Sequence, residues 1–141
     1  MKVLVTGVGG QLGHDVMNEL ARRGHQAWAV TSPRCTAALQ TLCRDEDAYV
    51  PMDITNDAQV RQVMDDVRPD AVIHCAAWTA VDLAEDADKQ PKVRAINVDG
   101  TAHLAAACKA QDCKMMYIST DYVFNGQGQT PWQPDCKDYQ P

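Results

Sequence analysis

The stretch KVLVTGVGGQLG (residues 2–13) decides the fold, because it joins a short apolar run to three glycines spaced three residues apart. A valine- and leucine-rich run that ends at glycine is typical of a strand buried on both faces of a parallel sheet. The glycines stand at Gly7, Gly10 and Gly13. In a dinucleotide-binding loop they serve a tight turn, the close approach of backbone to a pyrophosphate, and contact between helix and strand. We therefore predict a helix whose N-terminal amides and dipole face a pyrophosphate.

The remainder of the chain alternates predicted strands with predicted helices. In residues 11–23, Leu12, Val16 and Leu20 recur at helical spacing, and Gly24 ends the helix. The further expected strands are 26–31, 48–52, 71–75 and 114–119, and the further expected helices are 33–43, 55–67 (capped by Thr55) and 91–110. Because βαβ units generate parallel sheets, this order predicts one α/β domain over residues 1–141. We expect a Rossmann-type doubly wound parallel sheet of five or more strands with helices on both faces.

Composition and charge exclude several classes of partner. The net charge of −6 lacks the basic face that attracts nucleic acid or an anionic membrane. No apolar run approaches the roughly 20 residues that span a bilayer, and the first residues show no signal-peptide pattern. Six cysteines without a C-x-x-C pair predict reduced, mostly buried thiols, and we interpret the four scattered histidines as structural, with no metal site. Together these features predict a soluble cytoplasmic protein.

The end of the second expected strand bears on the choice between NADH and NADPH. An acidic residue there binds the ribose 2′-hydroxyl of NAD, whereas an arginine suits the 2′-phosphate of NADP. The sequence has no carboxylate at this point, and Thr31, Ser32 and Arg34 offer hydrogen bonds to a phosphate. The alternative is that Arg34 is only a solvated surface residue. The pattern favours NADPH by a narrow margin.

Two further segments follow expected strands at the edge of the sheet where ligands of open α/β folds bind. After the third strand, Asp53 can accept a hydrogen bond from an adenine amino group and Ile54 can pack on the ring, although Asp53 can also cap the next helix with Thr55. After the fourth strand comes Ala77-Trp78-Thr79, whose small neighbours let a cofactor pass close to backbone. Small residues equally serve tight helix packing. We call Asp53–Ile54 the adenine segment and, after the role that the family resemblance given below implies, Ala77–Thr79 the nicotinamide segment.

Polar side chains also follow the fifth expected strand. Ser119, Thr120 and Asp121 are costly to bury without partners, which favours a binding site over a packing role. The hydroxyl of Thr120 can hydrogen-bond a substrate carbonyl or alcohol. Tyr122 is not a candidate proton donor of the Y-x-x-x-K type, because the fourth residue after it is Gly126 rather than lysine.

These segments together resemble the extended short-chain dehydrogenase/reductase superfamily and, within it, the dTDP-4-dehydrorhamnose reductase family. The resemblance covers the whole chain, and T-A-V-D-x-A-E and S-T-D-Y-V-F…T-P-W are its most specific strings. The strings that carry it are Gly10–Gly13, Met52–Ile54, Ala77–Asp82 with Ala84-Glu85, Asn97 with Gly100-Thr101, Ser119–Phe124 and Thr130–Trp132.

The resemblance implies a role for each matched residue. The residues that it places against the nicotinamide cofactor are Gly10, Gln11, Leu12, Asp53, Ile54, Ala77, Trp78 and Thr79. It makes Thr120 the threonine of the catalytic triad, sets Asp121 beside the substrate and gives Asn97 a supporting position near the active site. The implied reaction transfers hydride from the cofactor to C4 of dTDP-4-dehydro-L-rhamnose, giving dTDP-L-rhamnose. A tyrosine donates the proton, and a neighbouring lysine lowers its pKa.

The family also implies parts that these residues do not include. Its Y-x-x-x-K and its sugar-nucleotide-binding domain are expected past Pro141, so we expect the chain alone to bind dinucleotide weakly and to be inactive. Some members dimerise through magnesium held by acidic residues, and Asp15 matches one such position. A homodimer and magnesium are therefore expectations for the full-length protein.

Three rival functions remain open on the sequence. A sugar-nucleotide epimerase or dehydratase shares the cofactor half but holds its NAD tightly. A non-catalytic regulatory relative has the same fold and lacks Y-x-x-x-K. A ligand-free structural module leaves the glycine loop and the polar residues 119–121 without a purpose.

Overall fold

A computed structural model describes residues 1–32, 48–128 and 130–136, and a five-stranded parallel sheet lies at its centre. The strands are β1 (Lys2–Thr6), β2 (Gln26–Thr31), β3 (Ala48–Pro51), β4 (Ala71–His74) and β5 (Lys114–Tyr117). They lie in the order β3-β2-β1-β4-β5, and every neighbouring pair is parallel. The predicted Rossmann-type α/β fold is confirmed, and the last three strands end one or two residues earlier than predicted.

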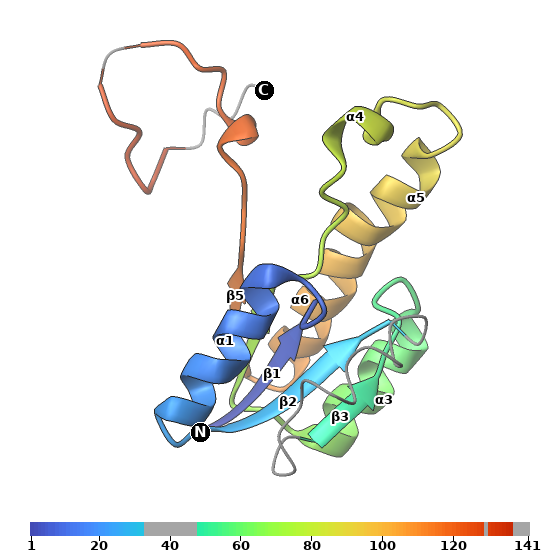
Figure 1. Cartoon of the computed structure of the whole chain (residues 1–141), viewed down its shortest axis with the longest axis vertical. Helices are drawn as coiled ribbons and strands as arrows, with labels where there is room; N and C mark the ends of the chain where they lie inside the picture. The colour runs from blue at the N-terminus through green and yellow to red at the C-terminus, as the bar shows by residue number, and fades with distance from the viewer. Residues whose placement is uncertain (33–47, 129, 137–141) are drawn as a thin grey trace.

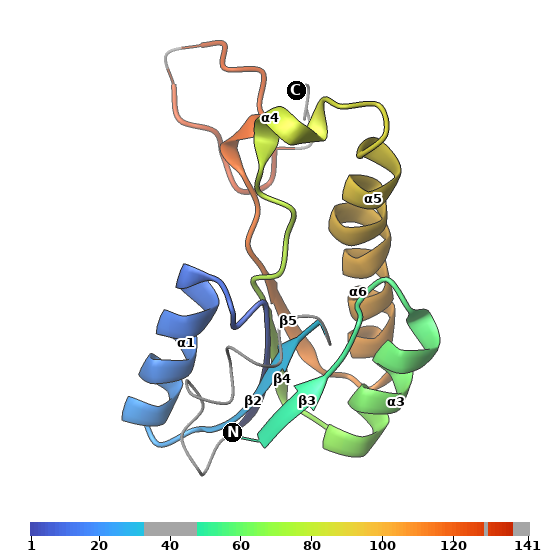
Figure 2. The same cartoon turned by 45° about the vertical axis from the view of Figure 1, so that its right-hand side comes forward.

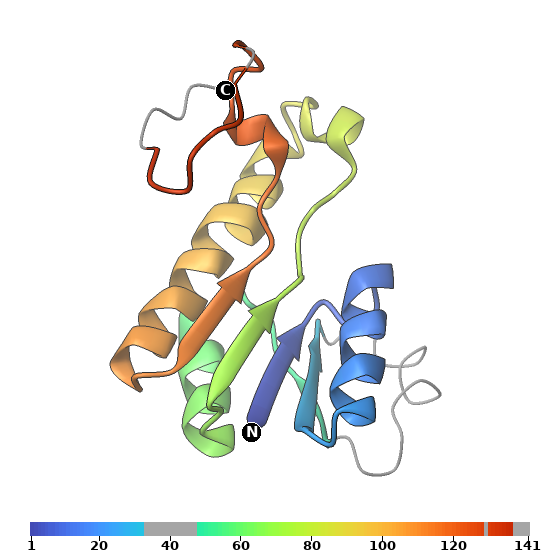
Figure 3. The same ribbon diagram turned by 90° about the vertical axis from the view of Figure 1, so that its left-hand side faces the viewer.

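Helices cover both faces of this sheet. Helix α1 (Gln11–Arg22) lies on one face, while α3 (Asp57–Val67) and α6 (Thr101–Ala110) lie on the other (Figures 1 and 3). Side chains of β1 alternate between the two layers. Val3 and Val5 are buried with Met17 and Leu20 of α1, whereas Leu4 is buried in the cluster of α3 and α6. Each fully buried aliphatic side chain contributes about 1.5–3 kcal/mol, so the central strand anchors both layers.

The third predicted helix begins differently from the prediction. The structure corrects the predicted cap: Asn56, not Thr55, is the N-cap of α3, and its Oδ1 accepts a hydrogen bond from the amide of Gln59 at 3.1 Å. Thr55 instead donates its hydroxyl to Asp53 Oδ1 at 2.7 Å. The threonine hydroxyl is therefore committed to the preceding loop and does not cap the helix.

The long helix predicted at 91–110 is not uniform. It follows the short helix α4 (Val81–Ala84) and runs through α5 (Gln90–Arg94), a π-helical segment η2 (Ala95–Gly100) and α6. Figure 2 shows α4 and α5 beyond the end of the sheet, so that only the α6 end packs on it. Single-turn π segments are rare and occur frequently at functional sites.

Other expectations are met only in part. The helix predicted at 33–43, with Arg34, lies outside the described residues. The four described cysteines are free, as predicted, but only Cys108 is fully buried. Burial raises the pKa of the Cys108 thiol to about 12. Among the described residues, no helix is both long and apolar enough to cross a membrane.

The strand order reverses between β1 and β4, which makes their carboxyl ends the topological switch point of the sheet. Thr6, the last residue of β1, pairs in register with His74, the last residue of β4. The glycine loop and the segment after β4 therefore leave the sheet side by side. We call Thr6–Gly7 together with His74–Ala76 the β1–β4 junction.

Candidate functional site

The glycine loop contacts the segment that follows β4. Gly7 has φ +73°, and a Cβ built there would lie 2.6 Å from the amide nitrogen of Ala76. A Cβ at Gly13 would lie 2.7 Å from the carbonyl carbon of Gly7, within the turn itself. Gly10 is exposed and less crowded, with 3.4 Å between such a Cβ and the Gly7 oxygen. Two of the glycines thus permit backbone contact, and the third leaves an open surface.

Helix α1 begins at this loop with an open N-terminus. Gly10 is its N-cap and provides no side-chain cap. Gly10, Gln11 and Leu12 are exposed, and within the described residues no backbone acceptor outside the helix pairs with the amides of residues 11–13. Free amides at the positive end of a 12-residue helix dipole are suited to bind an anion.

A chain of hydrogen bonds stabilises the β1–β4 junction from within. Thr101 donates its hydroxyl to the carbonyl of Asn97 at 2.9 Å, and therefore accepts from His74 Nε2 at 3.1 Å. His74 is 1% exposed, and burial lowers its pKa to about 4, so its ring is neutral near pH 7. Its Nδ1 then accepts the hydroxyl of Thr6 at 2.6 Å, and the Thr6 oxygen accepts from the amide of Ala76 at 3.3 Å. Each hydrogen bond of this series therefore has one defined donor and one defined acceptor.

The nicotinamide segment is fixed at Trp78. The side-chain amide of Asn97 accepts from the Trp78 amide at 2.7 Å and donates to the Trp78 carbonyl at 3.2 Å. The indole N–H donates to the carbonyl of Ala80 at 3.0 Å, and the Lys92 ammonium lies 5.3 Å from the centroid of the Trp78 ring. Ala77 and Thr79 on either side are exposed. The segment therefore combines a fixed peptide with open neighbours.

The adenine segment is held differently. Asp53 is exposed, and its Oδ1 accepts from both the amide of Thr55 (3.0 Å) and its hydroxyl (2.7 Å). Its amide donates to Gln59 Oε1 at 2.6 Å. Ile54 is only 8% exposed and belongs to the cluster between the sheet, α3 and α6. Most of the Ile54 side chain therefore packs in the core, which leaves little of it for an adenine ring.

The end of β2 offers fewer accessible groups for a 2′-phosphate than the sequence indicates. Thr31 is 7% exposed, and its carbonyl accepts from the amide of Met52. Ser32 is half-buried, and Arg34 lies outside the described residues. Ser32 is thus the more accessible of the two described candidates for a 2′-phosphate contact.

The segment after β5 (Ser119–Phe124, the post-β5 segment) leaves the body of the sheet (Figure 1). Ser119, Thr120 and Asp121 are all exposed, so the argument from the cost of burying them was wrong. Thr120 accepts from the amide of Tyr122 at 3.2 Å and donates to Asp121 Oδ1 at 3.3 Å, which caps the 3₁₀ turn η3 (Asp121–Val123). The hydrogen bonds found for Thr120 are therefore local.

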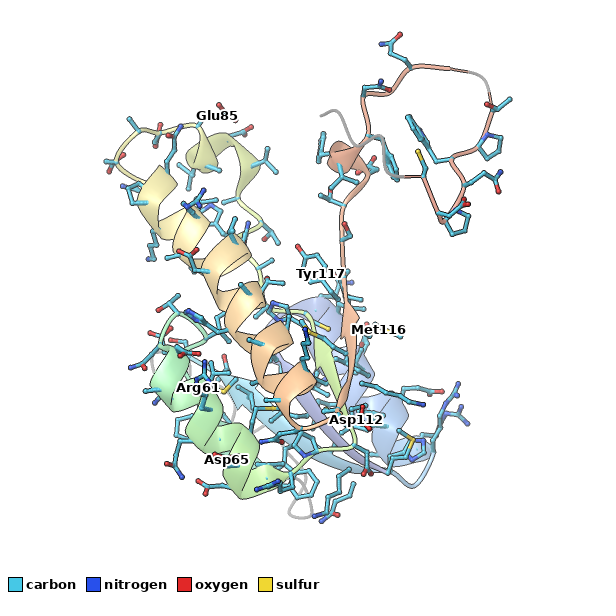
Figure 4. The ribbon with its side chains drawn as sticks, turned by 180° about the vertical axis from the view of Figure 1, so that it is seen from behind. Arg61, Asp65, Glu85, Asp112, Met116 and Tyr117 are labelled. Carbon is cyan, nitrogen blue, oxygen red and sulfur yellow. The ribbon has the colours of Figure 1, made fainter. Side chains whose placement is uncertain are left out.

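The strand before this segment is also open. Met116 is 58% and Tyr117 46% exposed, and both belong to β5, the strand at the edge of the sheet beside β4 (Figure 4). The ring of Tyr117 still reaches His74, with 5.6 Å between the ring centroids. Beyond it, Tyr122 is 71% exposed.

Sequence reasoning missed the polar residues that organise the junction. Thr6 and His74 each end an apolar strand, and a polar residue at that position was the available signal. It became meaningful only with the register that pairs them. The interpretation of His74 as a structural residue agrees with its burial.

Comparison with known proteins matches the chain to one family. The family model described as the RmlD substrate binding domain matches residues 1–140. The dTDP-4-dehydrorhamnose reductase of Streptomyces griseus is 40% identical over 132 residues, which are 94% of this chain and 37% of that protein. A crystal structure of dTDP-4-dehydrorhamnose reductase from Bacillus anthracis in complex with NADP is 35% identical, with a TM-score of 0.71 over 90% of this chain and 39% of that one.

A third relative shares the fold alone. The Thermus thermophilus UDP-glucose 4-epimerase complex with NAD has a TM-score of 0.79 over all of this chain and 44% of that one, at 21% identity. The chain thus spans less than half the length of each of these relatives.

Proposed function

Since the chain belongs to the family of the RmlD substrate binding domain, we propose that it forms the cofactor-binding part of an NAD(P)H-dependent dTDP-4-dehydrorhamnose reductase. The reaction is reduction of the C4 carbonyl of dTDP-4-dehydro-L-rhamnose to the alcohol of dTDP-L-rhamnose. The observation that carries the proposal is the open N-terminus of α1, which lies behind a glycine turn in contact with the segment after β4. That arrangement fits a pyrophosphate at the switch point of the sheet.

Different residues of the site bind different parts of the dinucleotide. Gly7 and Gly13 shape the turn, while Gly10, Gln11 and Leu12 present backbone to the pyrophosphate. Asp53 has one carboxylate oxygen, Oδ2, to which no described residue donates, and this oxygen is the acceptor for the adenine amino group. Ala77 and Thr79 border the nicotinamide. Their position is fixed by the hydrogen bonds that hold the Trp78 peptide between them.

Thr120 acts at the reacting carbonyl. The nicotinamide, when bound, supplies the hydride that the C4 carbon accepts. The exposed Thr120 hydroxyl is positioned to donate a hydrogen bond to the C4 oxygen, and Asp121 lies beside it for the sugar. Donating to the substrate requires the hydroxyl to turn from Asp121 Oδ1, a weak 3.3 Å contact between exposed atoms. Proton donation falls to the family's Y-x-x-x-K tyrosine, and we expect no turnover without it.

The choice of cofactor and the use of metal are finer parts of the proposal. We assign NADPH as the preferred cofactor, because the end of β2 carries Thr31 and Ser32 and no carboxylate. The B. anthracis relative described as a complex with NADP supports this choice. Asp15 matches one of the acidic positions through which some members of the family dimerise around magnesium, and no group of three metal-binding side chains gathers among the described residues. Magnesium binding and a homodimer are proposed for the full-length protein alone.

The test is a reductase assay on the full-length protein that carries this chain. We expect oxidation of NADPH, followed by its near-ultraviolet absorbance, that depends on dTDP-4-dehydro-L-rhamnose. A purified protein that carries tightly bound NAD and gives no net oxidation of NADPH would instead be an epimerase or dehydratase. Dinucleotide binding without any turnover would indicate the regulatory relative. Either result would overturn the reductase assignment.

A further inference from the structure

One continuous helix, from Gln90 to Ala110, contacts both loops that we assign to the two ends of the dinucleotide. At one point Asn97 holds the Trp78 peptide through two hydrogen bonds. Further along the helix, His103 Nδ1 donates to the carbonyl oxygen of Ile54 at 2.9 Å. At a rise of about 1.5 Å per residue, these two contacts stand roughly 9 Å apart along the helix axis. The nicotinamide and adenine segments are therefore attached to the same rigid element.

The helix also approaches the adenine segment very closely. A Cβ at Gly100 would lie 2.8 Å from both Cγ1 and Cδ1 of Ile54 and 3.3 Å from its Cβ. The side chain of Ile54 thus packs on bare helix backbone, while its carbonyl is held by His103. Because Ile54 is 8% exposed, it cannot shift without disturbing the core. These two contacts fix the position of Ile54 against the helix.

The fixed position of Ile54 also determines where its neighbour Asp53 lies. Its Oδ1 is engaged by Thr55 and its amide by Gln59, so its carboxylate has a defined direction relative to the Ile54 peptide. An acceptor for an adenine amino group works only at hydrogen-bond distance, within about 0.5 Å of the productive place. Whatever fixes Ile54 therefore fixes the adenine acceptor.

We propose that His103 is a positioning residue for the adenine end of the cofactor. Through the Ile54 carbonyl it sets Asp53 relative to the helix whose Asn97 sets Trp78, so that one helix defines the spacing between the two ends of the site. This inference rests on the proposed dinucleotide-binding function. His103 touches no cofactor atom in this assignment and acts only through the Asp53–Ile54 backbone.

The test separates the two ends by using half-cofactors on the full-length protein. ADP probes the adenine end and reduced nicotinamide mononucleotide probes the other, each measured by competition with NADPH fluorescence. We expect His103→Leu to raise the Kd of ADP about tenfold, the effect of losing one ordinary hydrogen bond, and to leave the Kd of the mononucleotide unchanged. His103→Asn, whose amide nitrogen replaces Nδ1 as donor, restores ADP binding.

Two controls keep the result interpretable. His25→Leu removes a half-buried histidine that precedes β2, at the opposite end of the sheet, and should change neither Kd. Asn97→Leu should give the converse pattern, weakening the mononucleotide more than ADP. Parallel weakening of both half-cofactors by His103→Leu, or unchanged ADP binding, overturns the positioning role. Failure of the wild-type protein to bind NADPH at all would remove the proposed function, and this inference with it.

Discussion

The β1–β4 junction and the post-β5 segment lie at the same end of the sheet, yet they are held in opposite ways. At the junction, backbones touch at Gly7 and Ala76, and His74 is buried between two hydroxyl groups. In the post-β5 segment, Thr120 is exposed, and its hydrogen bonds among the described residues reach no further than three positions along the chain. The difference teaches that the proposed cofactor end is pre-organised by long-range contacts, whereas the proposed substrate end of this chain is organised locally. Substitutions at the first should therefore cost stability, and at the second, activity.

The strongest test of this comparison uses two glycines with nearly the same backbone φ angle. Gly7 has φ +73° and Gly126 has φ +69°, but only at Gly7 would an added methyl group meet neighbours within 4 Å. We expect Gly7→Ala to lower the free energy of unfolding by about 3 kcal/mol and to abolish NADPH binding, because the methyl meets the Ala76 backbone. Gly126→Ala should cost about 1 kcal/mol and leave binding intact. Urea denaturation of both variants gives the comparison, and equal losses would contradict it.

Thr120 tests the other region. Thr120→Val keeps the shape and removes the hydroxyl, so we expect turnover of the full-length protein to fall about a hundredfold. Its free energy of unfolding should change by less than about 1 kcal/mol, because the side chain is exposed. Thr120→Ser is the matched control and should retain most activity. A variant that is as active as wild type, or that unfolds, would show that Thr120 is misassigned.

His74 makes the free energy of unfolding depend on pH. Its folded pKa of about 4 lies below the ordinary 6.5, so between these values the unfolded chain binds more protons than the folded one. The free energy of unfolding therefore falls as pH decreases, by about 2 kcal/mol between about pH 7 and pH 5. His74→Gln, which cannot titrate, should lose this part of the pH dependence. Urea denaturation midpoints of the wild type and of His74→Gln at the two pH values measure this difference. The same dependence of stability on pH in both proteins would refute the assignment.

Ser32 carries the smallest expected effect. A carboxylate there would repel a 2′-phosphate and accept from a 2′-hydroxyl, so Ser32→Asp should raise the Kd of NADPH about tenfold without weakening NADH. Ser32→Asn has the same shape without the charge and should leave the ratio of the two Kd values near that of wild type. Fluorescence titrations with both cofactors measure that ratio. An unchanged ratio in the Asp variant would place the 2′-phosphate elsewhere.

Most of the architecture was predictable because it rests on short-range signals. The apolar run before Gly7 and the five strands depend on local periodicity, and both were confirmed. The stripe on α1 was confirmed only in part, because Leu20 is buried while Leu12 is 47% exposed. The cap of α3 was not, because Asn56 and Thr55 are both good caps by composition. Only the contact with Asp53 decides between them.

The site was predictable as a set of positions but not as a set of contacts. Sequence motifs pointed to Trp78, Asp53 and Thr120, yet not to the π-helical segment that brings Asn97 to the Trp78 peptide. Nor did they indicate that Ile54 is held by His103, 49 residues away. Such contacts depend on strand register and helix placement, which no local pattern encodes.

The most direct measurement of the central claim is hydrogen exchange with and without saturating NADPH. A cofactor seated on the open N-terminus of α1 should slow exchange of the amides of residues 11–13, which have no described backbone acceptor outside the helix, and of residues 77–79. Residues 119–124 should change much less, because cofactor alone leaves the substrate end open. Unchanged exchange in residues 11–13 at saturating NADPH would contradict the claim that this chain binds the dinucleotide at its glycine loop.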